Sequence, residues 1–272
     1  KENILVGLVL RYSKHARSLR KLISEDKLGE IISLEASEHI MPWHGGFFMR
    51  NWRRKTSYSG GFMLEKCCHD LDFYSMVVGS RPIRVGSFGG RRSFVPENIP
   101  ELSKGDNLDV YKEYNLLGWE SKEEVFESDA DIVDHQVAIV EYENGATLSF
   151  HTNMKVPDEF RRFAIIGSKG MAEGDFVRGF LTAHDSHTGK KIFDDNFGSA
   201  FQQGTKGHYG ADKMMLKDIN DNLINNSKQT LPVGVLDCME AGLVAMKIDE
   251  SRLTNQIINL KNMWDKLDSY NL

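Results

Sequence analysis

The chain has 272 residues, of which 40% are hydrophobic and 27% charged, and its formal net charge is −5. This composition is typical of a soluble globular domain, and the scattered basic residues do not favour nucleic acid as a partner. The longest apolar run, residues 4–10, is far shorter than the roughly 20 residues that cross a bilayer, so we expect no membrane insertion.

The N-terminal part predicts a strand, a helix and a second strand. Residues 3–10 form a short continuous apolar run, typical of a buried strand in a parallel sheet. Ser13 suits the N-cap of a helix that Gly29 ends. Residues 31–40 alternate, which favours a half-buried strand of an antiparallel sheet. We expect its apolar face to consist of Ile32, Leu34, Ala36 and Ile40.

The rest of the chain predicts a meander followed by helices. We interpret residues 42–59 as a loop, 60–78 as a helix, 83–90 as a strand and 95–131 as an insertion over the sheet. Alternating segments joined by glycine-containing turns then indicate successive antiparallel strands. We expect strands at 133–142, 146–154, 161–166 and 171–176, helices near 209–225 and 234–253, and a tail without assigned structure at 262–272.

These elements together predict an α+β fold. Its main part is a large, mostly antiparallel open sheet with helices on one face. The strand at residues 3–10 is of the parallel type and precedes this sheet.

The predicted helix at residues 60–78 carries the strongest functional signal. At 100° per residue, Glu65, His69 and Asp72 fall within about 60° of one another around the helix axis. The remaining faces of the helix are largely apolar and predict burial. Because burying unpartnered charge is too costly, this polar row is expected to face water, a cleft or its own members.

A histidine flanked by carboxylates is suited to proton transfer. An ordinary imidazole titrates near neutral pH, and a neighbouring carboxylate raises its pKa. His69 is therefore a candidate to remove a hydroxyl proton while a hydride leaves the same carbon. The alternative is that the row is only the solvated face of an amphipathic helix.

The adjacent Cys67 and Cys68 raise the question of a metal site or a disulfide. Consecutive helical residues point about 100° apart, so they do not converge easily on one ion, and we expect no metal. With Cys238 as the third cysteine, no ordinary disulfide framework forms, which favours a reducing, cytoplasmic setting.

The segment from Ser59 to Asp72 resembles the signature of the Gfo/Idh/MocA family, a glycine run followed by Asp-x-x-x-His. The resemblance covers essentially the whole chain except the insertion near residues 97–131. It includes the segment at 4–35, which is similar to the family's last Rossmann strand and its entry into the second domain. The other similar segments are NWR at 51–53, ENGATLSFHT at 143–152, IIGSKGMAEGD at 165–175 and HYGAD at 208–212.

The resemblance implies one part of a two-domain enzyme. Residues 1–14 would be a remnant of the dinucleotide-binding Rossmann domain, and residues 15–272 the C-terminal substrate and oligomerisation domain. No GxGxxG opens a βαβ unit in this chain, and the Glu-Lys-Pro motif of the family's first domain is absent. NAD or NADP would therefore be bound mainly by the missing domain, and this fragment alone would be inactive.

The resemblance also implies catalytic roles. His69 takes the position of the family's acid/base, and Glu65 stands where the family usually has Asp. Glu65 is one methylene longer than Asp, and Lys66 follows it directly, so His69, Glu65 and Lys66 are the catalytic candidates.

Further residues are candidates for the substrate and the cofactor. The resemblance places Arg11 and Tyr12 near both the nicotinamide and the substrate. Aromatic faces and hydrogen-bond donors suit a sugar ring, although the tryptophans could equally fill the domain edge. The substrate candidates are Arg11, Tyr12, Trp43, His44, Trp52, Arg53, Asp72 and His208. Plain surface or core roles are favoured for His39, His135, His151 and Lys155, and Arg161 with Arg162 is interpreted as a strand edge.

The resulting hypothesis is an NAD(P)-dependent oxidoreductase acting on a secondary hydroxyl of a sugar, cyclitol or related polyol. One alternative is an NAD-dependent relative that cleaves glycosides. The other is a domain that only binds sugar or assembles subunits. The resemblance further implies a homo-dimer or homo-tetramer formed through the open sheet face.

Overall fold

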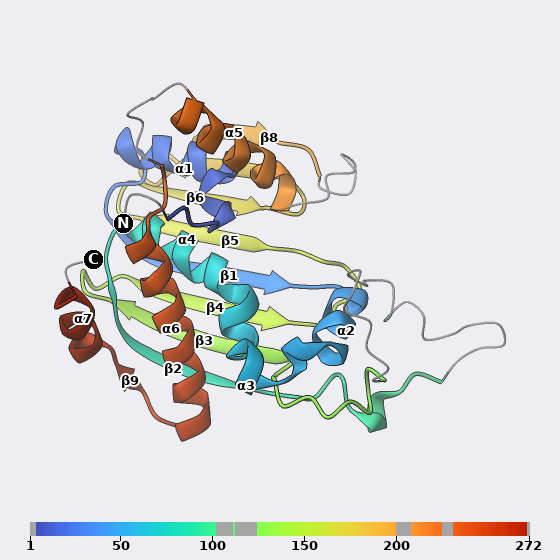
Figure 1. The fold of residues 1–272 in the computed structure, drawn as a ribbon. Coiled ribbons are helices and arrows are strands. Elements are labelled where there is room, and N and C mark those ends of the chain that lie inside the picture. Colours follow the sequence, from blue (N-terminus) through green and yellow to red (C-terminus); the bar gives the residue numbers. More distant parts are fainter. Residues whose placement is uncertain (1–3, 102–110, 112–123, 200–207, 225–230, 271–272) are drawn as a thin grey trace.

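The computed structural model describes residues 4–101, 111, 124–199, 208–224 and 231–270. Nine strands form one sheet in the order β8-β7-β6-β5-β1-β4-β3-β2-β9 (Figure 1). Strand β1 pairs in parallel with β4, and the other neighbouring pairs of these nine strands are antiparallel. The strands are β1 (Ile31–His39), β2 (Pro82–Gly90), β3 (His135–Tyr142), β4 (Thr147–Asn153), β5 (Arg162–Gly167), β6 (Gly170–Asp175), β7 (Phe180–Asp185), β8 (Lys191–Asn196) and β9 (Ile258–Asn259).

Helices cover one face of this sheet, so the predicted α+β class is confirmed. In Figure 1 the helices α4 and α6 cross in front of the strands. Within the described part of the chain, no helix combines the length and apolar character that a bilayer crossing requires. The helices are α1 (Lys14–Ser24), α2 (Pro42–Arg50), α3 (Thr56–Ser59), α4 (Cys68–Val78), α5 (Ala211–Ile224), α6 (Val235–Thr254) and α7 (Lys261–Asp268), with 3-10 turns η1 (Val9–Tyr12), η2 (Trp52–Arg54), η4 (Pro96–Asn98) and η6 (His208–Gly210) and a π-helix η3 (Met63–Cys67).

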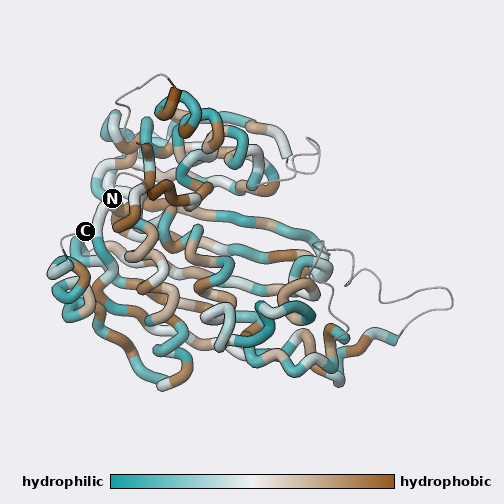
Figure 2. Tube along the Cα trace, in the orientation of Figure 1, coloured by the Kyte–Doolittle hydropathy of each residue, from teal (hydrophilic) through white to brown (hydrophobic). Residues whose placement is uncertain are grey.

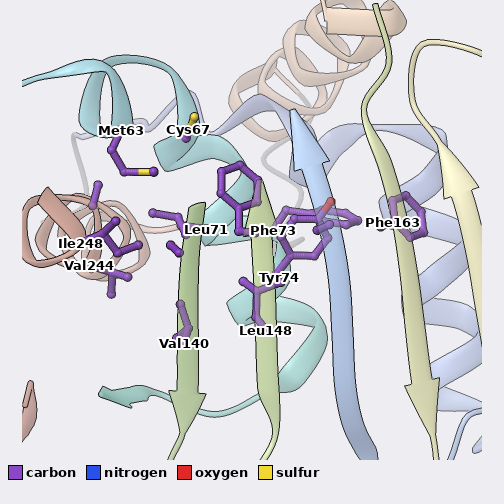
Figure 3. Close-up of a cluster of buried hydrophobic side chains, with 14 of the residues drawn as sticks. Met63, Cys67, Leu71, Phe73, Tyr74, Val140, Leu148, Phe163, Val244 and Ile248 are labelled. Carbon is purple, nitrogen blue, oxygen red and sulfur yellow. The ribbon is translucent and has the colours of Figure 1, made fainter. Parts of the chain in front are cut away.

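The apolar sides of α4 and η3 form the centre of the core (Figure 3). Leu71 is packed with Val244 and Ile248 of α6 in one buried cluster. Phe73 and Tyr74 extend the cluster towards the strands, where they meet Phe163 of β5 at ring-centroid distances of 6.0 and 6.4 Å. The predicted burial of this helix is confirmed, and it fixes the position of the polar residues on its other sides.

The strand predicted at residues 3–10 is wrong. Residues 4–8 carry no regular structure, and Val9–Tyr12 is a 3-10 turn. A strand needs a neighbouring strand to satisfy its backbone, and none lies beside this segment among the described residues. Leu8 and Tyr12 instead pack against Val233 and Ala241, and Figure 2 shows this hydrophobic stretch close to α5. The proposed division between residues 1–14 and 15–272 stays a prediction.

The alternation in β1 holds from Leu34 onwards but is wrong at the start of the strand. Ile31 is buried, whereas Ile32 is 52% exposed, because the pairing with β5 shifts register between Ile31 and Ser33. Leu34 and Ala36 are buried as expected. The next inward position belongs to Glu38, which is 0% exposed.

The predicted order of elements along the chain is otherwise largely confirmed. Ser13 caps α1 by accepting a hydrogen bond from the Ala16 amide, but the helix ends at Ser24, before Gly29. Residues 42–59 are not a loop, because α2, η2 and α3 occupy most of them. The sequence analysis did not predict β7, β8 and α7, and much of the insertion predicted at residues 95–131 falls outside the described residues.

The second face of the sheet is left uncovered by the described residues. Cross-strand register aligns Phe88 with Val137 and His151, and the next row aligns Ile139 with Ser149 and Glu35. Phe88 and Ile139 are 71% and 57% exposed. This face therefore carries large apolar side chains on neighbouring strands without a partner among the described residues.

Candidate active site

The π-helix η3 interrupts the signature helix at its N-terminal end. Gly60 and Gly61 precede it with φ of 74° and 96°, values that favour glycine. A Cβ on Gly61 would also lie 2.7 Å from Asp249 Oδ2 of α6, so this glycine allows close approach to that helix. A π-turn holds more residues per turn than an α-helix, which changes the angle between Glu65 and the residues after it.

The three residues of the predicted polar row therefore meet different partners. Glu65 forms an ion pair with Arg53 of η2, with Oε1 2.5 Å from Nε. Asp72 is buried and forms a two-point ion pair with Arg11, with distances of 2.7 and 2.8 Å. His69 lies beside His208, with ring centroids 5.7 Å apart. The three residues thus do not face one another, and His69 is the member that lies in the polar cluster described below.

Arg11 and Tyr12 occupy structural positions in this fold. The Arg11 guanidinium donates to Asp72, to Asp237 Oδ1 at 2.9 Å and to the Pro232 carbonyl at 3.0 Å. It thereby joins η1 to α4 and to the start of α6. Tyr12 is 1% exposed. Both side chains are buried, and their assignment to the cofactor and the substrate stays a prediction.

A buried cluster of four charged residues lies beneath His69. Arg161, at the start of β5, donates to Asp70 of α4 at 2.8 and 2.6 Å. Arg161 Nε also lies 2.9 Å from Glu38 Oε2, and Glu38 Oε1 lies 2.5 Å from Lys66 Nζ. The cluster holds two cations and two anions, so its formal charge is balanced. The interpretation of Arg161 as a strand-edge residue is wrong.

The pKa values in this cluster follow from burial and pairing. Burial would raise the pKa of Glu38, but Arg161 and Lys66 together lower it to about 2. Burial raises the pKa of Asp70, and Arg161 opposes the shift. The carboxylate of Glu38 is therefore charged at neutral pH and holds both cations.

The expectation that a neighbouring carboxylate raises the pKa of His69 is wrong, and the ring is a neutral imidazole at neutral pH. Burial lowers its pKa to about 3, and the nearby cations Arg161 and Lys66 act in the same direction. Its Nδ1 atom is buried and has no hydrogen-bond partner among the described residues. An unsatisfied buried polar atom is unfavourable, so this nitrogen is available to a ligand hydroxyl.

His208 is held beside His69 by an unusual backbone conformation. His208 and Tyr209 have φ of 39° and 59°, although neither is glycine. Such conformations cost on the order of 1–3 kcal/mol each and concentrate at functional sites. His208 Nδ1 lies 2.9 Å from Asp212 Oδ1, so Asp212 orients this ring.

The predicted aromatic and basic residues lie on α2 and η2. Trp43 stacks on His44 with ring centroids 5.2 Å apart and an interplanar angle of 9°. The Arg53 guanidinium lies 4.4 Å from the Trp52 ring centroid. Burial lowers the pKa of His44 to about 3, with Lys66 acting in the same direction. His44 thus belongs to the surroundings of Lys66 and His69, and Arg53 connects this segment to Glu65.

Other parts of the molecule offer less to a polar ligand. A hollow of about 340 Å³ between α1, α4 and α5 is lined by Arg17, Arg20, Asp218 and neighbours, and it does not include His69. Among the residues that the structure describes, no group of three or more His, Cys, Asp or Glu could hold a metal ion.

Sequence reasoning missed four polar residues of this site, namely Glu38, Asp70, Glu159 and Arg161. A signal existed for two of them. Glu38 follows Leu34 and Ala36 at the inward positions of β1, and Arg161 precedes Phe163 and Ile165 at those of β5. Charged residues at inward strand positions predict a buried ion pair or a functional cluster. Burial also raises the pKa of Glu159 to about 7.

The chain belongs to the GFO/IDH/MocA family. Residues 16–173 match the family model described as the GFO/IDH/MocA C-terminal domain. This confirms the family suggested by the signature helix and the segments around it.

Individual relatives are distant but extend over most of the chain. YteT of Bacillus subtilis (strain 168), whose name gives it provisionally as an oxidoreductase, is 23% identical and covers 79% of this chain and 59% of its own length. Levoglucosan dehydrogenase in complex with NADH has a TM-score of 0.69 at 15% identity, over 94% of this chain and 65% of the other. An oxidoreductase domain protein from Kribbella flavida gives 0.67 at 16%, over 93% and 64%. The chain thus spans less than two thirds of these relatives.

Proposed function

We propose that this chain is the substrate side of an NAD(P)-dependent oxidoreductase that acts on a secondary hydroxyl of a sugar, cyclitol or related polyol. The observation that carries the proposal is the buried, unpartnered Nδ1 of His69 beside Lys66 and His208. Family membership supports the reaction class, and the levoglucosan dehydrogenase relative was solved with both NADH and levoglucosan.

His69 performs the proton transfer in this proposal. Its neutral imidazole accepts the hydroxyl proton as the C–O bond becomes a carbonyl. A bound NAD(P) would supply the acceptor for the hydride that leaves the same carbon. Because the pKa of His69 is about 3, the ring does not retain this proton in the free protein. His208, paired with Asp212 and partly exposed, offers the next position on the way to solvent.

Two further parts of the site orient the substrate. The stacked pair Trp43 and His44, and Trp52 covered by Arg53, present aromatic surface and donors suited to a sugar ring. Glu65 is engaged by Arg53, so its role in this proposal is to fix that arginine rather than to accept a proton. We assign no step to Arg11 or Tyr12, because their side chains are committed to the fold.

The test is His69→Ala in the full-length enzyme, with NAD(P) reduction followed over a panel of sugars and polyols. We expect turnover to fall roughly 10²–10⁴-fold, the usual contribution of an acid/base group. His187→Ala, in an exposed turn, is the control and should leave turnover unchanged. Unchanged turnover in His69→Ala would remove this residue from the mechanism. Absence of NAD(P) reduction by the unmodified enzyme with every polyol would favour a binding domain.

A further inference from the structure

Glu38 is a fully buried carboxylate near the proposed active site. Its side chain is 1% exposed, yet it lies between two cations, Lys66 on η3 and Arg161, which directly precedes β5. Removing a charge from water is expensive unless partners compensate it, so the two ion pairs explain how Glu38 can be charged there.

The four charged side chains form a series of ion pairs that begins in the interior and ends on the side of His69. Asp70 pairs with Arg161, Arg161 with Glu38, and Glu38 with Lys66. The side chains of the first three are 0–1% exposed, whereas that of Lys66 is 14% exposed. Lys66 is therefore the member of this series of ion pairs that is accessible to a ligand.

Lys66 also lies among the imidazoles of the site. Its charge acts on His44, His69 and His208, in each case lowering the pKa of the ring. A lysine ammonium has three N–H donors, and the ion pair with Glu38 engages one side of it. The remaining donors are not engaged by Glu38, and the charge of this ammonium reaches the ring of His69.

We propose that Glu38 is a positioning residue that fixes the Lys66 ammonium beside His69. Fixed in this way, Lys66 donates a hydrogen bond to the substrate oxygen from which His69 takes the proton. The ammonium would then stabilise the negative charge that develops on this oxygen during proton loss. This inference rests on the proposed function for its catalytic part, but the Glu38–Lys66 link is a separate claim.

The link can be tested on this chain without any activity. Glu38→Gln keeps the size of the side chain and removes the charge that holds Lys66. Asp70→Asn is the matched control. It also removes one negative charge from the cluster, but that carboxylate pairs with Arg161. The measurement is the rate of reductive methylation of Lys66 near pH 8, quantified by peptide mass spectrometry with exposed Lys217 as the internal reference.

We expect Lys66 in Glu38→Gln to react roughly tenfold faster than in the unmodified chain, because the ion pair that holds its ammonium is lost, and a tenfold change corresponds to about 1.4 kcal/mol of that interaction. In Asp70→Asn the rate should stay within about twofold of the unmodified chain. Equal rates for Lys66 in both variants would overturn the positioning role, because Glu38 would then act only as one of two buried charges.

The catalytic part is tested in the full-length enzyme by a double-mutant cycle. Glu38→Gln should lower kcat/KM roughly a hundredfold, the effect of misplacing a catalytic group by about 1 Å. Lys66→Met should lower it at least as much, and the double variant should be no worse than Lys66→Met alone. Additive losses would overturn the claim that Glu38 acts through Lys66.

The double variant also guards against failure to fold. Glu38→Gln leaves an excess positive charge in the interior, whereas Glu38→Gln with Lys66→Met restores charge balance. If the single Glu38 variant is unfolded, equal kcat/KM in Lys66→Met and the double variant supports the proposal, and a further loss overturns it. If the unmodified enzyme reduces no NAD(P), the proposed function fails and the methylation rates alone decide the Glu38–Lys66 link.

Discussion

The two faces of the nine-stranded sheet differ from ordinary protein surfaces in opposite ways. Beneath the helices, where apolar residues are expected, lie the charged side chains of Glu38, Asp70 and Arg161, all 1% exposed or less. On the uncovered face, where polar residues are expected, Phe88 and Ile139 are 71% and 57% exposed. Each face therefore carries the kind of residue that its surroundings disfavour.

This difference separates two uses of the same sheet. Buried charges that are paired and lie beside an unsatisfied histidine indicate chemistry with a small polar ligand. Exposed apolar side chains on adjacent strands indicate contact with another protein surface. We propose that the uncovered face joins copies of this chain, as the resemblance to the family suggested.

Arg161→Met gives the largest expected effect and tests the covered face. It leaves Asp70 without its cation and Glu38 with Lys66 alone, so we expect the free energy of unfolding to fall by about 3–5 kcal/mol, the cost of breaking a buried pair. Urea denaturation followed by circular dichroism measures this. The neighbouring Arg162→Met is the control, because Arg162 is exposed and stacks on Phe160 at 4.1 Å. Equal losses in the two variants would contradict a special role for the buried cluster.

Ile139→Lys tests the uncovered face. Ile139 lies opposite Gly86 and Ser149, so a lysine fits the strand but opposes apolar contact with another copy. We expect the dissociation constant of the oligomer to rise at least about tenfold, equivalent to 1.4 kcal/mol, as measured by analytical ultracentrifugation. Leu253→Lys, equally exposed but on α6, should leave assembly unchanged. A chain that is monomeric before mutation would refute the proposed use of this face.

A third and smaller effect is the dependence of the free energy of unfolding on pH. Burial lowers the pKa of His15 to about 4 and those of His44 and His69 to about 3. Below pH 6.5 the unfolded chain binds protons that the folded chain does not, so stability falls as the pH drops towards these values. Glu159, with a pKa raised to about 7, and Asp72, raised to about 6, act in the opposite direction down to about pH 4.

We therefore expect the free energy of unfolding to decrease gently from pH 7 to about pH 4.5 and steeply below that pH. There the lowered pKa of Glu38 adds to the effect of the histidines. His15→Phe removes one imidazole from the covered side and should flatten the dependence by at most about 1.4 kcal/mol per pH unit. Urea midpoints at a series of pH values measure it, and an unchanged profile would show that His15 is not buried in its neutral form.

The sequence predicted the sheet well because strand patterns are local. The turn at Gly145 and the alternation in β3 and β4 placed these strands within two residues of the observed bounds. The prediction at residues 3–10 was wrong because an apolar run does not reveal whether a neighbouring strand exists. Such information is tertiary, since Leu8 buries its side chain against helices instead.

The candidate site was predicted only in part. The sequence identified His69 and Lys66, and the structure brings them together with His44 and His208. A spacing of 100° per residue also grouped His69 with Glu65 and Asp72. The π-turn at Met63–Cys67 breaks this spacing between Glu65 and His69, and each carboxylate pairs with an arginine, Glu65 with Arg53 and Asp72 with Arg11. No local sequence pattern indicates a π-turn, so the geometry of this helix could not be predicted.

The position of β1 in the sheet has a consequence for synthesis. This early strand lies between two meanders, and its parallel partner β4 begins only at Thr147. At roughly 5–20 residues per second, a ribosome needs roughly 5–20 seconds to make residues 40–146 that separate them. During that interval the edges of β1 are unpaired and Glu38 lacks Arg161. We therefore expect the nascent chain to depend on chaperones until its second half emerges.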